Sequence, residues 1–228
     1  MTMRIVNFLS AAVVLVAASS ANADVIAYWA QNDNGLPGGG FGFETTDFPM
    51  DADIGDGTWN ILPVDASATS GVYDSIQSFS GTSTNAVAPF GSGGSFAFQG
   101  DQNNGASVIW AVDASLFSDL SISWAQRGTS TGYTSRALSY STDGVSFTAI
   151  GTDTGALSGS WQTESYDLTG LAGVDGASNL QLQLTFDGAS SSSGNNRLDN
   201  VLIEGTFIPE PTAGLLVLVG SAFIARRR

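Results

Sequence analysis

Apolar and polar residues alternate along several short stretches of this chain. Over residues 180–186 every second side chain is apolar, residues 120–124 repeat the pattern, and residues 136–140 follow it more loosely. Side chains of a β-strand point alternately to its two faces, so a period of two predicts strands with one buried face. Shorter stretches of the same character are residues 25–29, 95–99, 107–112, 146–150, 163–168 and 201–206.

Turn-forming residues separate these stretches. Thr142, Asp143 and Gly144 predict a tight hairpin turn, because Asp-Gly readily adopts the positive φ angles that such turns need. No stretch of ten or more residues between 24 and 208 has the apolar spacing of a helix. Many short strands with turns between them predict an all-β fold. We expect one jelly-roll-like antiparallel β-sandwich over residues 24–208, which is a suitable length for a single domain.

The first 23 residues have the three parts of a secretory signal peptide. Arg4 lies near the start, an apolar run occupies residues 5–18, and Ala21 and Ala23 form a small-residue cleavage motif. This order predicts a signal-peptide helix over residues 1–23, cleavage after Ala23, and export. The chain has no cysteine, so no disulfide supports the exported domain.

The other end of the chain, residues 209–228, combines proline, an apolar run and arginine. Residues 212–225 carry no charge, and a helix of that length spans about 21 Å, which predicts a short transmembrane helix. Terminal arginines can reach the lipid headgroups and stay cytoplasmic, which places the preceding domain outside. The flanking residues are Pro209, Glu210 and Pro211 before the run, and Arg226, Arg227 and Arg228 after it.

These last twenty residues resemble the PEP-CTERM sorting signal of bacterial exported proteins, which is also labelled an ice-binding protein C-terminal domain. The resemblance implies recognition by an exosortase, a membrane protease-transpeptidase that cuts near the Pro-Glu-Pro sequence. It also implies an inner-membrane anchor before processing and a final place at the cell surface or in the extracellular matrix. Pro209, Glu210 and Pro211 are the recognition residues that the resemblance implies.

The charge of the chain is strongly negative. Seven arginines and no lysine stand against 21 acidic residues, for a net charge of −14, and only Arg127, Arg136 and Arg197 fall between residues 24 and 208. Nucleic acid as a partner is excluded, since phosphate binding needs a basic surface. We expect the three arginines to form structural ion pairs, with Asp199 as the partner of Arg197.

The missing residue types limit the chemistry. Without histidine or cysteine, the chain has no Ser-His-Asp or Cys-His mechanism and no imidazole or thiolate zinc site. Two suitably spaced carboxylates suffice for glycoside hydrolysis, so an enzyme acting on glycans through Glu164 and Glu204 is one alternative. Each of these glutamates is more simply interpreted as an outward-facing strand residue.

Calcium is the metal that the acidic residues favour. Asp51, Asp53 and Asp56 precede Gly57 in a pattern that resembles part of a calcium-binding loop, although no glutamate occupies its twelfth position. The simpler interpretation is an acidic turn. Asp199 and Asn200 form a second calcium hypothesis, and calcium-dependent adhesion between copies is another alternative function.

Five tryptophans are the candidates for stacking on sugar rings. Trp110 and Trp124 lie among alternating aliphatic residues and are predicted to be core. Trp59 and Trp161 follow turn sequences and are predicted to be exposed, so these two are the candidate ligand-binding residues.

Residues 127–133, 138–147 and 194–205 resemble a domain common in PEP-CTERM proteins. They are also similar to jelly-roll carbohydrate-binding and laminin-G-like modules. The leading hypothesis is therefore a non-enzymatic exported protein of the envelope or extracellular matrix, with an extracellular polysaccharide as its expected partner. The carboxylate-based enzyme and the calcium-dependent adhesin remain the alternatives.

Overall fold

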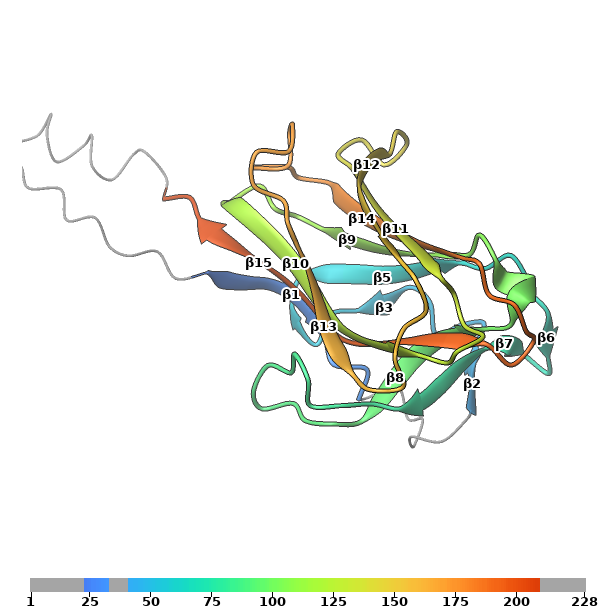
Figure 1. The fold of residues 1–228 in the computed structure, drawn as a ribbon. Helices are drawn as coiled ribbons and strands as arrows, with labels where there is room; N and C mark the ends of the chain where they lie inside the picture. The colour runs from blue at the N-terminus through green and yellow to red at the C-terminus, as the bar shows by residue number, and fades with distance from the viewer. Residues whose placement is uncertain (1–22, 33–40, 210–228) are drawn as a thin grey trace, which may run out of the picture.

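The computed structural model describes residues 23–32 and 41–209, and it is an antiparallel β-sandwich (Figure 1). The one helical turn in these residues is η1 (Asp101–Asn103), and no helix among them could span a membrane. The signal-peptide and C-terminal helices predicted from the sequence lie outside the described residues. The strands are β1 (Asp24–Trp29), β2 (Phe41–Glu44), β3 (Met50–Asp51), β4 (Ile54–Gly55), β5 (Gly57–Leu62), β6 (Ala68–Thr69), β7 (Val72–Ser80), β8 (Gly94–Gln99), β9 (Ser107–Val112), β10 (Phe117–Gly128), β11 (Ser135–Ser141), β12 (Thr148–Thr154), β13 (Gln162–Asp167), β14 (Leu180–Asp187) and β15 (Asn195–Phe207).

Two sheets form the layers of the sandwich. The larger sheet has the order β13-β10-β15-β8-β7-β2. In addition, β1 pairs with β15 and β4, and β6 pairs with β7. The smaller sheet has the order β12-β11-β14-β9-β5-β3. Strand β15 is the longest, and it pairs with β1, β8 and β10. Asp24 at the start of β1 is opposite Gly205 near the end of β15, so both ends of the domain emerge side by side. The predicted all-β sandwich is confirmed.

The period-two pattern produces the buried faces as predicted. In β14, Leu180, Leu182, Leu184 and Phe186 are buried, and the residues between them are partly exposed. Strands β9 and β11 place their own alternate residues against the same core, because β14 lies between them in the smaller sheet. The hairpin from β11 to β12 also follows the sequence, since Asp143 Oδ1 accepts hydrogen bonds from the N–H groups of Val145 and Ser146, both at 2.8 Å.

Aromatic rings fill the centre of the core. The rings of Trp59 and Trp110 meet edge to face at 5.5 Å, and Trp110 stacks on Trp124 at 5.8 Å. Trp110 and Trp124 are buried, as predicted. Trp59 was predicted to be exposed, and that interpretation is wrong, because its side chain is fully buried beside Phe96. The Asp-Gly-Thr sequence before it is the entry to β5, whose third residue points inward.

Candidate functional site at the open edge of the sandwich

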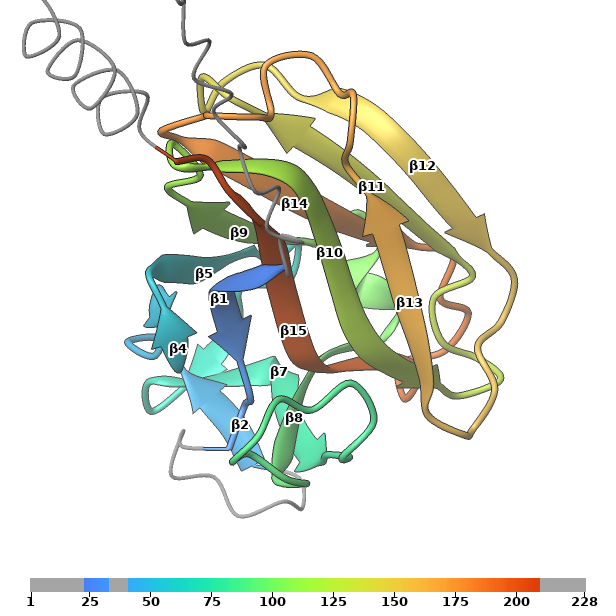
Figure 2. The same cartoon turned by 90° about the vertical axis from the view of Figure 1, so that its left-hand side faces the viewer.

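The candidate site lies where the two sheets meet at one edge. Strand β13 ends the larger sheet and β12 ends the smaller, and the two pair with β10 and β11 rather than with each other. Figure 2 shows β12 and β13 along the same side of the molecule. Inward side chains of both edge strands therefore face one another between the sheets, and they remain partly open to solvent.

Arg136 on β11 makes most of the polar contacts that hold this edge together. Its side chain is 2% exposed, and its guanidinium lies against Asp153, its direct cross-strand partner on β12. Nε and Nη2 donate to Asp153 Oδ2 at 3.0 and 2.7 Å, Nη1 donates to the Tyr133 carbonyl, and Nη2 also donates to the Gly155 carbonyl. A buried cation needs such a full set of acceptors, so the arginine is held firmly and in turn orients the carboxylate.

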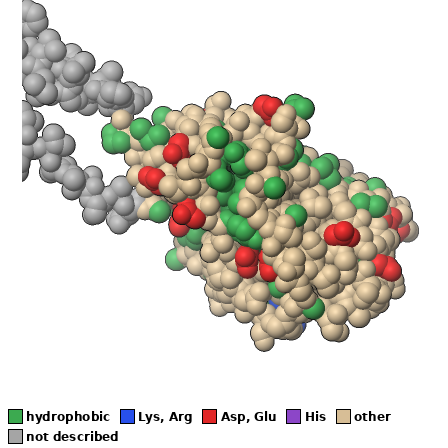
Figure 3. Space-filling model, turned by 45° about the horizontal axis from the view of Figure 1, so that its top comes forward, with side chains coloured by type: hydrophobic (Ala, Val, Ile, Leu, Met, Phe, Trp, Pro, Cys, Tyr) green, Lys and Arg blue, Asp and Glu red, His purple; other side chains and the backbone are tan. Residues whose placement is uncertain are grey.

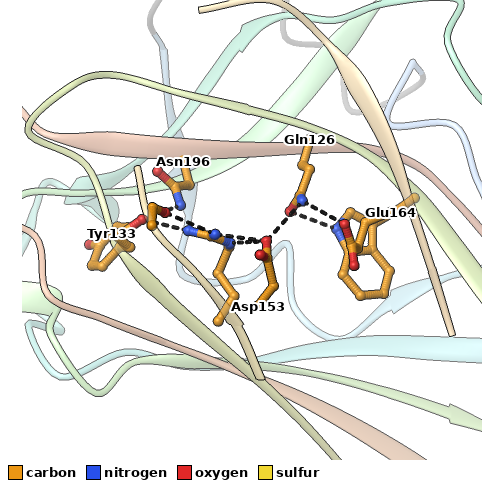
Figure 4. A network of polar contacts seen from close by, with 8 residues as sticks. Gln126, Tyr133, Asp153, Glu164 and Asn196 are labelled. Carbon is orange, nitrogen blue, oxygen red and sulfur yellow. Dashed lines mark hydrogen bonds and ion pairs between the residues drawn. The ribbon is translucent and has the colours of Figure 1, made fainter. Parts of the chain in front are cut away.

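Gln126 connects Asp153 to Glu164. Its Nε2 lies 3.4 Å from Asp153 Oδ2 and 3.3 Å from Glu164 Oε2, and its Oε1 accepts a hydrogen bond from Trp124 Nε1 at 3.2 Å. Figure 4 shows Gln126 between the two carboxylates. Because the indole N–H fixes which end of the amide is the acceptor, the amide nitrogen must face the acids. The amide of Gln126 and the carboxyl groups of Asp153 and Glu164 are therefore held in a fixed arrangement.

The environment of Glu164 changes its acidity. Burial raises the pKa of its carboxyl group above the ordinary value, the nearby Asp153 raises it further, and Arg136 opposes both effects. The side chain is partly exposed, so solvent screens these effects. The pKa of the neighbouring Tyr166 is also raised, by burial first and then by Glu164. Glu164 is therefore a carboxyl group that holds its proton more readily than an exposed one.

Tyr166 provides an aromatic wall beside the acids. Its ring stacks on Trp124 with centroids 5.7 Å apart and is only partly buried. The Tyr166 ring also lies close to Gly151 on β12. A Cβ at position 151 would lie only 3.0 Å from Tyr166 Cε1, so the absence of a side chain there leaves room for the ring. Hydrophobic side chains form a band across the face that Figure 3 displays, with acidic side chains at several places around it.

Trp161, one of the two ligand-binding residues predicted from the sequence, lies just before β13 and is partly exposed. The Arg127 guanidinium carbon is 5.8 Å from the centroid of its ring. Trp59 and Trp161 therefore do not form one binding surface, since Trp59 lies in the core.

The suggested pairing of Glu164 with Glu204 is wrong. Trp124 is the cross-strand partner of Glu164, and both side chains lie between the sheets. Glu204 lies 3.5 Å from the hydroxyl of Ser121, on the outer face of the same sheet. The carboxylate that meets Glu164 is instead Asp153, through Gln126.

The predicted calcium ligands are not gathered into a cation site. Asp53 Oδ2 accepts a hydrogen bond from the Ala30 N–H at 2.6 Å, whereas Asp51 lies in the ladder of β3 with β5. Asp56 lines a shallow cavity of about 200 Å³ with Asp113 and Asn179. Across residues 23–32 and 41–209, no three acidic side chains lie together as metal ligands would.

Asp199 does not pair with Arg197. Its carboxyl group is fully buried and accepts hydrogen bonds from the Thr82 N–H at 2.6 Å and the Asn200 N–H at 2.8 Å. Asn200 donates from Nδ2 to the carbonyls of Thr82 and Thr84 and accepts from the Tyr28 hydroxyl. This acid and its neighbour therefore hold the loop after β7 against the sheet.

The remaining predicted residues belong to the ends of the chain. Ala23 and Pro209 are the first and last described residues, and Ala21, Glu210, Pro211, Arg226, Arg227 and Arg228 lie outside the described residues. Sequence reasoning missed Gln126 and Asp153 as site residues. The one available signal was their position as polar residues in strand patterns, which many surface residues share.

Comparison with known proteins shows similarity in structure alone. No family model matches the chain, and no curated protein matches it. The structure of TmCBM61 in complex with beta-1,4-galactotriose is 10% identical, with a TM-score of 0.39 over 64% of this chain and 86% of that one. The K3 cleaved adhesin domain of Lys-gingipain from Porphyromonas gingivalis W83 is 12% identical, with a TM-score of 0.39 over 64% and 90%. A structure of carbohydrate-binding modules from the β-sandwich superfamily is 9% identical, with a TM-score of 0.42 over 74% of this chain and 63% of that one.

Proposed function

We propose that this protein is an exported, non-enzymatic glycan-binding protein of the cell envelope or extracellular matrix. The glycan site is the open edge between β12 and β13. An exosortase-type protease processes the C-terminal sorting signal, of which Pro209, Glu210 and Pro211 are the recognition residues, after the signal peptide has directed export. The sequence of both chain ends supports the sorting part of this proposal.

One observation supports glycan binding most directly. Three planar polar side chains, Gln126, Asp153 and Glu164, meet beside the partly exposed ring of Tyr166. A sugar offers hydroxyl groups at its rim, which suit the partly exposed carboxylates of Asp153 and Glu164, and apolar C–H groups on its faces, which suit the ring of Tyr166. The fully buried Gln126 holds the two carboxylates in place. Preorganised polar groups with an aromatic wall are typical of small-ligand sites.

The test is co-sedimentation of the exported protein, purified from its producing cells, with those cells' own extracellular polysaccharide. We expect the wild type to bind. Tyr166→Ala and Glu164→Gln should weaken binding at least about tenfold, which corresponds to about 1.4 kcal/mol. Glu204→Gln is the matched control, because this acid is on the outer face of the same sheet, and it should bind as the wild type does. Equal loss in both glutamate variants, or no binding by the wild type, would refute the site.

The sorting part is tested separately by fractionation of the producing cells. Wild-type protein should reach the surface or matrix fraction and lose its C-terminal segment. Glu210→Ala should retain the full-length chain in the membrane fraction. A processed, surface-located Glu210→Ala chain would contradict recognition of this residue.

A second candidate function is glycan hydrolysis, because the same site contains two carboxyl groups in different environments. Glu164 has a raised pKa and Asp153 is held by Arg136, and a proton-holding acid beside a second carboxylate is the arrangement that glycosidases use. Gln126 Nε2 lies within 3.4 Å of both carboxylates and occupies the space between them, which favours binding over hydrolysis. Release of reducing ends by the wild type, abolished in Glu164→Gln, would establish the enzyme instead.

A further inference from the structure

The two other arginines of the described chain lie side by side without an acidic partner. Arg127 on β10 and Arg197 on β15 are direct cross-strand partners, and both side chains are partly exposed on the outer face of the larger sheet. Within residues 23–32 and 41–209, neither forms an ion pair, whereas Arg136 does. The expectation that all three arginines are structural ion-pair residues holds for Arg136 alone.

This juxtaposition is unfavourable by itself. Like charges directly opposite each other on one face of a sheet destabilise it. Burial lowers the pKa of Arg197, and the charge of Arg127 lowers it further. The chain has 21 acidic residues, yet none of those within residues 23–32 and 41–209 forms an ion pair with Arg127 or Arg197. The site is therefore a local concentration of positive charge in an acidic protein.

Aromatic rings flank both guanidinium groups. The Arg197 guanidinium carbon is 4.0 Å from the centroid of the Phe79 ring, and its Nε donates to Asn195 Oδ1 at 3.4 Å. Arg127 lies over Trp161 at 5.8 Å. These cation–π contacts hold the two guanidinium groups and leave several of their N–H donors free to meet a ligand. Trp161 and Phe79 are both partly exposed.

We propose that the Arg127–Arg197 pair binds the carboxylate of an acidic sugar residue, such as a uronic acid at the end of a glycan. A guanidinium group binds a carboxylate through paired, parallel hydrogen bonds, and the charge of the second arginine adds to the attraction of the anion. Trp161 is partly exposed and lies farther from its arginine, so it can present apolar surface to the sugar itself. This site lies on the outer face of the larger sheet, so it goes beyond the glycan site proposed between the sheets and does not depend on it.

The overall charge restricts the ligand to short or sparsely charged glycans. The acidic domain repels a long polyanion at a distance, and this repulsion is screened within about 10 Å at 0.1 M salt. A single carboxylate can approach the pair with much less repulsion. We therefore expect a short acidic oligosaccharide to bind better than a long acidic polymer at low salt.

The probe is a trimer of galacturonic acid, titrated by calorimetry into the exported protein, and its methyl ester is the neutral control. We expect the acid to bind and the ester to bind at least about tenfold more weakly. Arg127→Gln and Arg197→Gln should each reduce acid binding at least tenfold. Glu204→Gln, which lies outside both proposed sites, should leave acid binding unchanged, so a general effect of removing one acidic group is distinguishable from loss of the arginine site.

Urea unfolding with and without the trimer distinguishes loss of binding from loss of folding in the arginine variants. Arg127→Gln should unfold at the same or higher urea concentration than the wild type without ligand, because it removes a repulsion. The trimer should raise the unfolding midpoint of the wild type and leave that of Arg127→Gln unchanged.

Several results would overturn the proposal. These are no binding of the acid by the wild type, equal binding of acid and ester, or full binding by both arginine variants. Salt-sensitive self-association that Arg197→Gln abolishes would assign the pair to an acidic surface of a second copy, and that result would also overturn the sugar assignment.

Discussion

Arg136 and Asp153 face each other across the ladder of β11 and β12, and their side chains form an ion pair of 2.7 Å inside the sandwich. Arg136 also donates hydrogen bonds to the carbonyls of Tyr133, just before β11, and Gly155, just after β12. The pair therefore fastens the edge strand β12 and positions the carboxylate for Gln126.

Replacement of Arg136 should destabilise the protein. Removing one partner of a buried ion pair typically lowers the free energy of unfolding by about 3 to 5 kcal/mol, and partial exposure of Asp153 favours the lower part of that range for Arg136→Met. Urea unfolding measures the loss. Arg127→Met is the control, since Arg127 has no ion pair in the described chain, and it should cost much less. Equal losses in the two variants would contradict the role of Arg136.

Asp199 should make the protein less stable as the pH rises. Burial raises the pKa of its carboxyl group to about 8, although hydrogen bonds from the N–H groups of Thr82 and Asn200 oppose the rise. The folded state then keeps a proton that the unfolded chain loses near pH 4. The free energy of unfolding should therefore fall between about pH 4 and pH 8, by at most about 1.4 kcal/mol per pH unit.

Chemical unfolding between pH 5 and 9 tests this dependence. Asp199→Asn should remove the Asp199 part of the slope, whatever its effect on stability at a single pH. Glu164 also has a raised pKa and contributes a slope of the same sign, but it is present in both proteins and drops out of the difference. A variant whose pH dependence parallels that of the wild type would show that Asp199 does not hold its proton.

Gly55 should not tolerate a side chain. Its φ angle is +78°, and an added Cβ would overlap the carbonyl oxygen of Ile26 in the paired strand β1. Gly71 has a similar φ of +86° but no atom within 4 Å of the added Cβ. We expect Gly71→Ala to cost about 1 kcal/mol for the backbone conformation and Gly55→Ala at least about 3 kcal/mol. Comparable unfolding midpoints for the two variants would rule out the steric explanation.

Trp59 and Trp161 should differ sharply in their contribution to stability. Trp59 is fully buried among Trp29, Phe96 and Trp110, and replacing such a residue with alanine typically costs about 3 to 5 kcal/mol. Trp161 is partly exposed, so Trp161→Ala should cost about 1 kcal/mol or less. Thermal unfolding of the two variants, followed by circular dichroism, checks the difference. A larger loss for Trp161→Ala would place that ring in a structural role.

Strand boundaries were predictable where the buried residues are apolar and the exposed residues are polar. Residues 107–112, selected from their sequence, coincide with β9 (Ser107–Val112). Strand β7 (Val72–Ser80) was missed, because two of its buried residues are Ser75 and Ser78, whose polarity hides the alternation. The Ser75 hydroxyl is satisfied by Asn103 Nδ2 at 2.9 Å, and such a distant partner is invisible in the local pattern.

The all-β class, the core strand β14 and the hairpin at Asp143 were predictable from the amino-acid sequence, because they depend on residues close together in the chain. The sequence also contains the terminal signals that support the export proposal. Three features required the folded structure: Glu164 meets Asp153 through Gln126, Trp59 is core, and Arg127 lies opposite Arg197. These contacts depend on which strands pair and in what register, and a shift of one residue would turn each side chain to the other face of its sheet.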